Sequence, residues 1–136
     1  MISALTQIQS ALLSGGTSGS ILIVDDDEDN LLLMSYALET LGLKATMART
    51  GREAIVLASQ QRPTLMLIDI VLPDVNGIDV LTQLRRLPQL LNVPAIAVTA
   101  LARAVDREQI FAAGFTDYLA KPYMLEDLNR LIQQYL

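Results

Sequence analysis

Short apolar runs alternate with amphipathic stretches from Ile21 to the end of the chain. The apolar runs have the length of strands, and the stretches between them carry apolar residues at helical spacing. The predicted strands lie at 21–24, 43–48, 65–68, 95–98 and 117–120. The first predicted helix lies between the first two strands and ends before Gly42, and the others lie at 52–60, 78–87, 105–113 and 125–135. Strands that alternate with helices in this way predict a doubly wound α/β domain, in which helices cover both faces of a parallel sheet.

The first repeat shows the pattern most clearly. Ile21 to Val24 form a continuous run rich in β-branched residues, which is typical of a strand buried on both faces. Asp29 or Asn30 can cap the following helix, and Gly42 supplies its C-terminal stop. Gly114 closes the fourth helix in the same manner.

The length and composition limit the classes of function. The 136 residues suffice for one compact domain, predicted at 21–136, and the Gly- and Ser-rich stretch before it predicts a flexible tail and linker at 1–20. The net charge of -5 argues against direct binding of nucleic acid or an anionic membrane. Lys44 is the first basic side chain, and no apolar run could span a bilayer, so we expect a cytoplasmic protein.

Polar residues follow four of the predicted strands. Asp25 and Asp26 follow the first, Asp69 the third, Thr99 the fourth and Lys121 the fifth. Ligands of open α/β sheets bind at the carboxyl ends of the strands, so these side chains are expected to meet in one crevice. A single turn-forming acid or a single surface lysine would mean little. Their joint placement indicates a site.

The three carboxylates require a cation, because two like charges about 4 Å apart repel by roughly 4 kcal/mol at an effective dielectric of about 20. The chain has no histidine and no cysteine, so the ligands are oxygen atoms, which favours Mg²⁺. Lys121 adds a positive charge and Thr99 a hydroxyl donor. Together these groups indicate a pocket for a phosphoryl group, with a carboxylate as the nucleophile.

Four segments carry a resemblance to a known family: ILIVDDDEDN, LMLIDIVLPDVNGID, AIAVTA and DYLAKPY. In this order they resemble the receiver domain of bacterial two-component response regulators, the CheY-like family. The resemblance covers the chain from Ile21 onward and implies a flavodoxin-like sheet with strand order 2-1-3-4-5. It also implies that the chain is a single-domain response regulator, a regulated phosphoprotein rather than an enzyme.

The resemblance further assigns roles to individual residues. Asp69 is implied to be the phosphoacceptor, and Asp25, Asp26, Asp69 and the Val71 carbonyl are implied to bind Mg²⁺. Thr99, the Ala100 N–H and Lys121 are implied to contact the phosphoryl group. Thr99 and Tyr118 are the implied switch residues, and the Lys121–Pro122 peptide bond is implied to be cis.

The implied partners are proteins. A histidine kinase or a phosphotransfer protein supplies the phosphoryl group, as in a phosphorelay. A downstream effector then reads the surface formed by the fourth helix, the fifth strand and the fifth helix.

Two other classes of function fit these residues less well. A phosphatase of the haloacid-dehalogenase type needs a second Asp where Val71 stands, and a flavin carrier needs a phosphate loop where acids follow the first strand. A receiver-like interaction module that works without phosphorylation remains as the alternative. Asp74 is predicted to be a turn former and Asp79 a first-turn helix acid, neither with a catalytic role.

Overall fold

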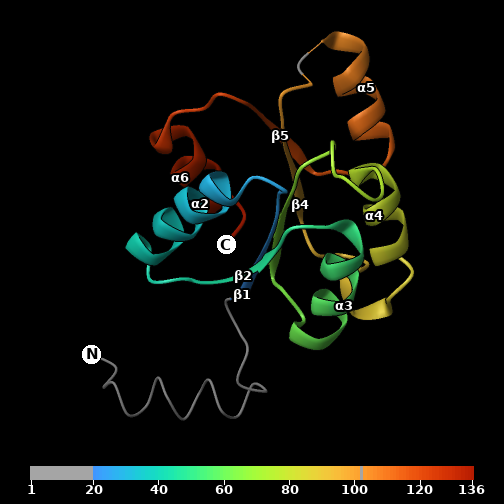
Figure 1. Cartoon of the computed structure of the whole chain (residues 1–136), viewed down its shortest axis with the longest axis horizontal. Coiled ribbons are helices and arrows are strands. Elements are labelled where there is room, and N and C mark those ends of the chain that lie inside the picture. Colours follow the sequence, from blue (N-terminus) through green and yellow to red (C-terminus); the bar gives the residue numbers. More distant parts are fainter. Residues whose placement is uncertain (1–19, 102) are drawn as a thin grey trace.

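A computed structural model describes residues 20–101 and 103–136, which form a five-stranded sheet with helices on both faces (Figure 1). The strands are β1 (Ser20–Val24), β2 (Lys44–Ala48), β3 (Leu65–Ile68), β4 (Ala95–Thr99) and β5 (Asp117–Ala120). The helices are α2 (Glu28–Thr40), α3 (Gly51–Gln61), α4 (Gly77–Leu84), α5 (Ala104–Ala112) and α6 (Leu125–Gln134), with a short 3₁₀ helix at Pro88–Leu90.

The sheet is parallel throughout, and its strand order is β2-β1-β3-β4-β5. This confirms the predicted fold class and strand order. In Figure 1, α2 and α6 cover one face of the sheet, while α3, α4 and α5 cover the other. The same figure shows the carboxyl ends of the central strands leading into loops on one edge of the sheet.

Two apolar clusters fill the spaces between the sheet and its helices. Leu22 and Val24 of β1 point into the cluster under α3 and α4, whereas Ile21 and Ile23 point into the cluster under α2 and α6. The period-two alternation of a strand therefore supplies both layers from one run of residues. This explains why β1 reads as continuously apolar, since all five of its residues are buried.

The start of α2 differs from the prediction. Asp27, and not Asp29 or Asn30, caps this helix, because Asp27 has extended backbone angles and its side chain accepts a hydrogen bond from the Asp29 N–H at 2.9 Å. Five consecutive acids, 25–29, precede the apolar part of the helix. Propensity alone could not show which of them faces the free N–H groups.

The end of α4 also differs, because the helix stops at Leu84 rather than near Leu87. Pro88 disfavours helical angles at the residue before it, and Leu87 is accordingly extended. The Arg85 guanidinium donates hydrogen bonds to the Leu90 and Val93 carbonyl oxygens and so orders the turn that follows. A turn replaces the last predicted residues of α4, 85–87, and a 3₁₀ helix follows it.

The sheet begins at Ser20, one residue before the predicted first strand. Ser20 is buried, and its hydroxyl lies 3.2 Å from the Thr46 hydroxyl of β2. The remainder of the predicted tail, 1–19, lies outside the described residues. Within the described ranges, no helix has the length and apolar character needed to cross a membrane.

Candidate functional site

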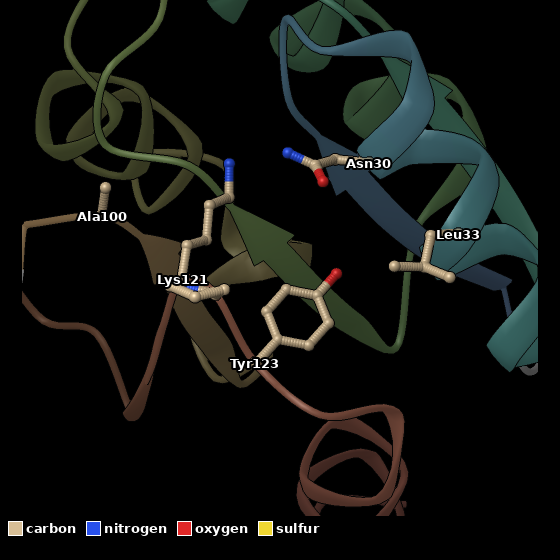
Figure 2. A pocket seen from close by; sticks show the side chains of 6 residues that line it. Asn30, Leu33, Ala100, Lys121 and Tyr123 are labelled. Carbon is tan, nitrogen blue, oxygen red and sulfur yellow. The ribbon is translucent and has the colours of Figure 1, made fainter.

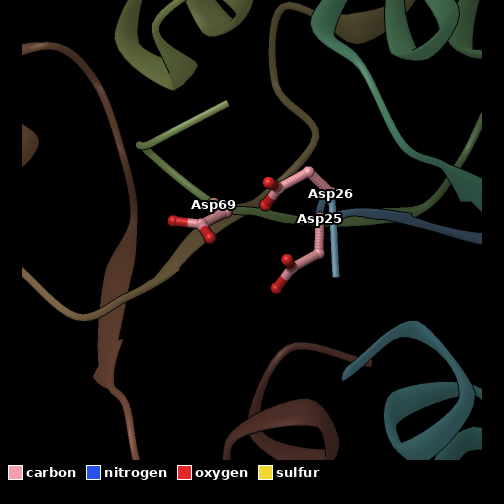
Figure 3. A group of neighbouring side chains, drawn as sticks. All are labelled: Asp25, Asp26 and Asp69. Atoms are coloured by element: carbon pink, nitrogen blue, oxygen red, sulfur yellow. The ribbon is translucent and has the colours of Figure 1, made fainter. Parts of the chain in front are cut away.

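The ends of β1 and β3 bring three carboxylates together (Figure 3). Val24 pairs with Ile68 across the two strands, so the residues that follow them, Asp25 and Asp69, leave the sheet side by side. One carboxylate oxygen from each of Asp25, Asp26 and Asp69 lies within 4.8 Å of the others. Asp25 and Asp69 are buried and Asp26 is exposed, which leaves the cluster open to solvent on one side.

Lys121 reaches this cluster from the end of β5. Its Nζ donates to Asp25 Oδ2 at 2.6 Å and to Asp69 Oδ2 at 2.9 Å. The backbone N–H of Lys121 donates to the Thr99 carbonyl oxygen, which fixes the end of β5 against the end of β4. One ammonium group therefore bridges two carboxylates from strands far apart in the sequence.

Backbone N–H groups donate hydrogen bonds to the second oxygen of each buried carboxylate. Asp25 Oδ1 accepts from the Asp27 N–H at 2.9 Å, and Asp69 Oδ1 accepts from the Val71 N–H at 3.2 Å. Both carboxylates are thus oriented from two directions. Such an arrangement keeps both carboxylates in place before any ligand binds.

Burial acts in opposite directions on the pKa values of the Asp25 carboxyl and the Lys121 ammonium. Burial raises the pKa of the Asp25 carboxyl, and the hydrogen bonds from Lys121 and the Asp27 N–H only partly offset this rise. Burial lowers the pKa of Lys121, but the hydrogen bonds to Asp25 and Asp69 outweigh it, so the pKa is raised overall. Lys121 therefore stays charged, while one ammonium shared by two acids leaves negative charge for a further cation.

A divalent cation fits this donor set. The three carboxylates supply oxygen ligands, one acid of the set is exposed, and the chain has no histidine or cysteine that would favour a softer metal. The sequence predicted Asp25, Asp26 and Asp69 as ligands, and the structure brings these three together. The Val71 N–H donates to Asp69, and Val71 as a whole is 59% exposed.

The remaining predicted site residues surround the Lys121 bridge less closely. Thr99 is fully buried, and its hydroxyl accepts from the Leu101 N–H at 3.3 Å. Tyr118 is half-buried and packs against the apolar cluster under α3 and α4. The Lys121–Pro122 peptide bond is cis.

A hollow of about 320 Å³ lies beside Lys121, between the start of α2 and the loop before α6 (Figure 2). Ala100, a predicted site residue, lies on its rim. Figure 2 shows the Tyr123 hydroxyl directed toward Asn30 and Leu33 of α2, and this hydroxyl is buried. Sequence reasoning did not single out Asn30, Leu33 or Tyr123 for this position, because their proximity depends on how α2 packs beside the end of β5.

Two further residues support the site without touching its carboxylate oxygens. A Cβ on Gly77 would lie 2.2 Å from the Asp69 carbonyl oxygen, so only glycine fits between α4 and the end of β3. Asp74 accepts from the N–H groups of Gly51 at 2.8 Å and Arg52 at 3.0 Å, and thereby caps α3 from a distant loop. The Asp-Val-Asn-Gly sequence indicated a turn here but contained no signal for either contact.

The geometry of the site agrees with the families and proteins that the chain resembles in sequence. Residues 21–133 match the response regulator receiver domain family. An uncharacterized 14.6 kDa protein of Leptolyngbya boryana is 41% identical over 85% of this chain and 88% of its own length. The polar-differentiation response regulator DivK of Brucella anthropi is 38% identical over 86% of this chain and 95% of its own.

Solved structures show the same likeness. The chemotaxis response regulator CheY4 of Vibrio cholerae superposes with a TM-score of 0.83 at 26% identity, over 87% of this chain and 98% of that one. The receiver domain of the sensor histidine kinase PA1611 from Pseudomonas aeruginosa has a TM-score of 0.79 at 35% identity, over 86% and 96% of the two chains. That structure has a magnesium ion coordinated in its active site cleft.

Proposed function

We propose that this chain, which belongs to the response regulator receiver domain family, is a phosphorylation-controlled switch with Asp69 as its phosphoacceptor. Receiver domains are signalling modules that interact with histidine kinases or phosphotransfer proteins and with effectors. The observation that carries the proposal is the Lys121 ammonium, which joins Asp69 to Asp25 in a cluster of three acids. A surface salt bridge or a simple helix cap would not require charged side chains from three separate strand ends to meet.

In the proposed step, an oxygen of the Asp69 carboxylate attacks the phosphorus of a phosphohistidine on the donor protein. An O–P bond forms, and the N–P bond breaks with its electron pair remaining on the imidazole nitrogen. Lys121 and the Thr99 hydroxyl hold the phosphoryl oxygens, and the backbone N–H of Ala100 lies near them. These groups act by position and charge, which is sufficient for phosphoryl transfer.

We propose that Asp25, Asp26, Asp69 and the Val71 carbonyl hold Mg²⁺ at this site. The ion, when bound, would supply the positive charge that offsets the phosphoryl oxygens. The exposure of Asp26 supports a further cation here, and so does the sharing of one Lys121 ammonium between Asp25 and Asp69, which leaves the three acids with excess negative charge.

The readout is proposed to be the surface of α5, β5 and α6. The Lys121 N–H donates to the Thr99 carbonyl oxygen, and this contact would couple a change at the phosphoryl pocket to the ends of β4 and β5. Tyr118 lies on β5, paired with Ala97 of β4, and is half-buried, which suits a side chain that follows Thr99 inward. A shift from 1:99 to 99:1 requires about 5.5 kcal/mol in favour of the active state.

The mass of the intact protein after treatment with acetyl phosphate, with and without Mg²⁺, tests the proposal. We expect one added phosphate in the wild type with Mg²⁺, and none in Asp69→Asn or when the metal is chelated. No added phosphate under any condition would instead favour an interaction module that works without phosphorylation.

A further inference from the structure

The acidic loop between β1 and α2 is held from opposite sides. It consists of the acids 25–27, and the first two residues of α2, Glu28 and Asp29, are acidic as well. The mutual repulsion of these five charges disfavours a compact turn. On one side, Lys121 contacts Asp25. On the other, the Asp25 N–H donates to the Ala48 carbonyl oxygen at the end of β2.

Arg49, which directly follows β2, contacts Asp26, which directly follows Asp25 in the acidic loop. The Arg49 guanidinium, through Nη2, donates to the backbone carbonyl oxygen of Asp26 at 3.2 Å. The last residue of β2 and the residue after it thus contact the first two residues after β1. Asp26 is also the exposed member of the carboxylate cluster, so its orientation depends on its backbone more than on packing.

The contact of Arg49 is with the carbonyl and not with a carboxylate. Within residues 20–101 and 103–136, no ion pair forms between Arg49 and an acid, although Glu28 and Glu53 line the same hollow of about 200 Å³. The Asp26 carboxylate is therefore left available for a cation.

Given the magnesium-dependent function proposed above, we propose that Arg49 is a positioning residue of the magnesium site. By holding the Asp26 carbonyl, it fixes the loop so that the Asp26 carboxylate faces Asp25 and Asp69. Arg49 does not touch the metal in this arrangement. It acts through the backbone of Asp26.

The sign of the effect separates this role from simple electrostatics. A positive side chain near three acids repels a divalent cation, so its removal alone would strengthen Mg²⁺ binding. If Arg49 positions Asp26, its removal weakens Mg²⁺ binding instead. Arg52, three residues later, is a matched control because its side chain makes no described contact with the acidic loop.

Isothermal titration calorimetry with Mg²⁺ on the full chain can measure this sign. We expect Arg49→Met to weaken Mg²⁺ binding by about threefold to tenfold, the range for loss of one hydrogen bond. Arg49→Lys retains a donor and the charge, and should bind close to the wild type. Arg52→Met should bind as tightly as the wild type or slightly more tightly.

Unchanged or tighter binding by Arg49→Met would overturn the positioning role. The ¹³C chemical shift of the Asp26 carbonyl gives a second readout without metal, and it should move in Arg49→Met but not in Arg52→Met. An unmoved carbonyl signal in Arg49→Met would also overturn the role. Failure of the wild type itself to bind Mg²⁺ would contradict the proposed function. If the wild type and Arg49→Met bind Mg²⁺ equally well, only the positioning role of Arg49 is contradicted.

Discussion

At the scale of single residues, the candidate site depends on how each carboxylate oxygen is used. Asp25 and Asp69 both direct one oxygen to a backbone N–H and the other to Lys121. A side chain fixed at both oxygens has little rotamer freedom left to lose when a ligand binds. The site is therefore preorganised by the backbone as much as by its charges.

Gly77 is the most restrictive neighbour of Asp69, because any Cβ at this position would collide with the backbone of Asp69 and Ile70. We expect Gly77→Ala to reduce the free energy of unfolding by about 1–3 kcal/mol, the usual cost of overpacking. It should also slow phosphorylation of Asp69 under conditions where the variant is folded. Urea denaturation and intact-protein mass measure the two effects.

Gly42→Ala is the control for this prediction. Gly42 has a φ of +74° and no atom within 4 Å of its added Cβ, so the variant is strained but remains remote from the site. It should lose stability while its phosphorylation rate stays that of the wild type. Equal slowing in both variants would show that Gly77 acts only through overall stability.

At the scale of secondary structure, the loops connect elements that are not neighbours in the sequence. The loop after β3 supplies Asp74, whose carboxylate caps the first turn of α3, and then Asn76, whose side chain caps α4. The segment that begins at the proposed phosphoacceptor thus also fixes two helix starts. Displacement of this loop would be transmitted to both helices.

The Asp74 cap makes stability dependent on pH. The hydrogen bonds from the Gly51 N–H and, secondarily, the Arg52 N–H lower the pKa of Asp74 despite some desolvation. Its stabilising effect is therefore fully present above the unfolded pKa of 3.8 and is lost as the pH falls through the lower folded pKa. Asp74→Ala should be less stable than the wild type at pH 7, and the difference should shrink below about pH 4.

Urea denaturation of both proteins between pH 3 and pH 7 measures this difference. Asp79→Ala is the control, since Asp79 also lies in a first helical turn but makes no described hydrogen bond to another loop. A difference between wild type and Asp74→Ala that stays constant over the whole pH range would contradict the role of the charged cap.

At the scale of the whole molecule, the sheet separates two apolar clusters and carries the site at one edge. The residues of the site come from β1, β3, β4 and β5, so the site exists only when the sheet is assembled. Any ligand that binds the assembled site must therefore stabilise the folded state.

Magnesium should therefore raise the stability of the wild type. At a free concentration ten times Kd, binding to the folded state alone adds about 1.4 kcal/mol. Thermal unfolding in MgCl₂, compared with NaCl at equal ionic strength, measures the increase. Asp26→Asn removes a ligand without disturbing the Lys121 bridge, and should show a smaller increase; an equal increase would indicate that Mg²⁺ acts elsewhere.

The sequence by itself determined the order and type of the elements. Alternation of strand and helix patterns predicted the five strands, and the structure confirms the parallel doubly wound sheet. Strand-end placement predicted that Asp25, Asp26, Asp69 and Lys121 would lie together, as they do. These features are local or follow from the general geometry of parallel sheets, so a pattern can carry them.

Only the tertiary structure decided which atoms meet. The bridge of Lys121 between two acids, the close approach of Gly77 to Asp69, the Asp74 cap on α3 and the Arg49 contact with Asp26 each join residues from different loops. From the local sequence alone, the same residues are equally compatible with a surface lysine, a turn glycine, a turn acid and a solvated arginine. Their contacts depend on strand register and loop conformation, which no short-range pattern in the sequence encodes.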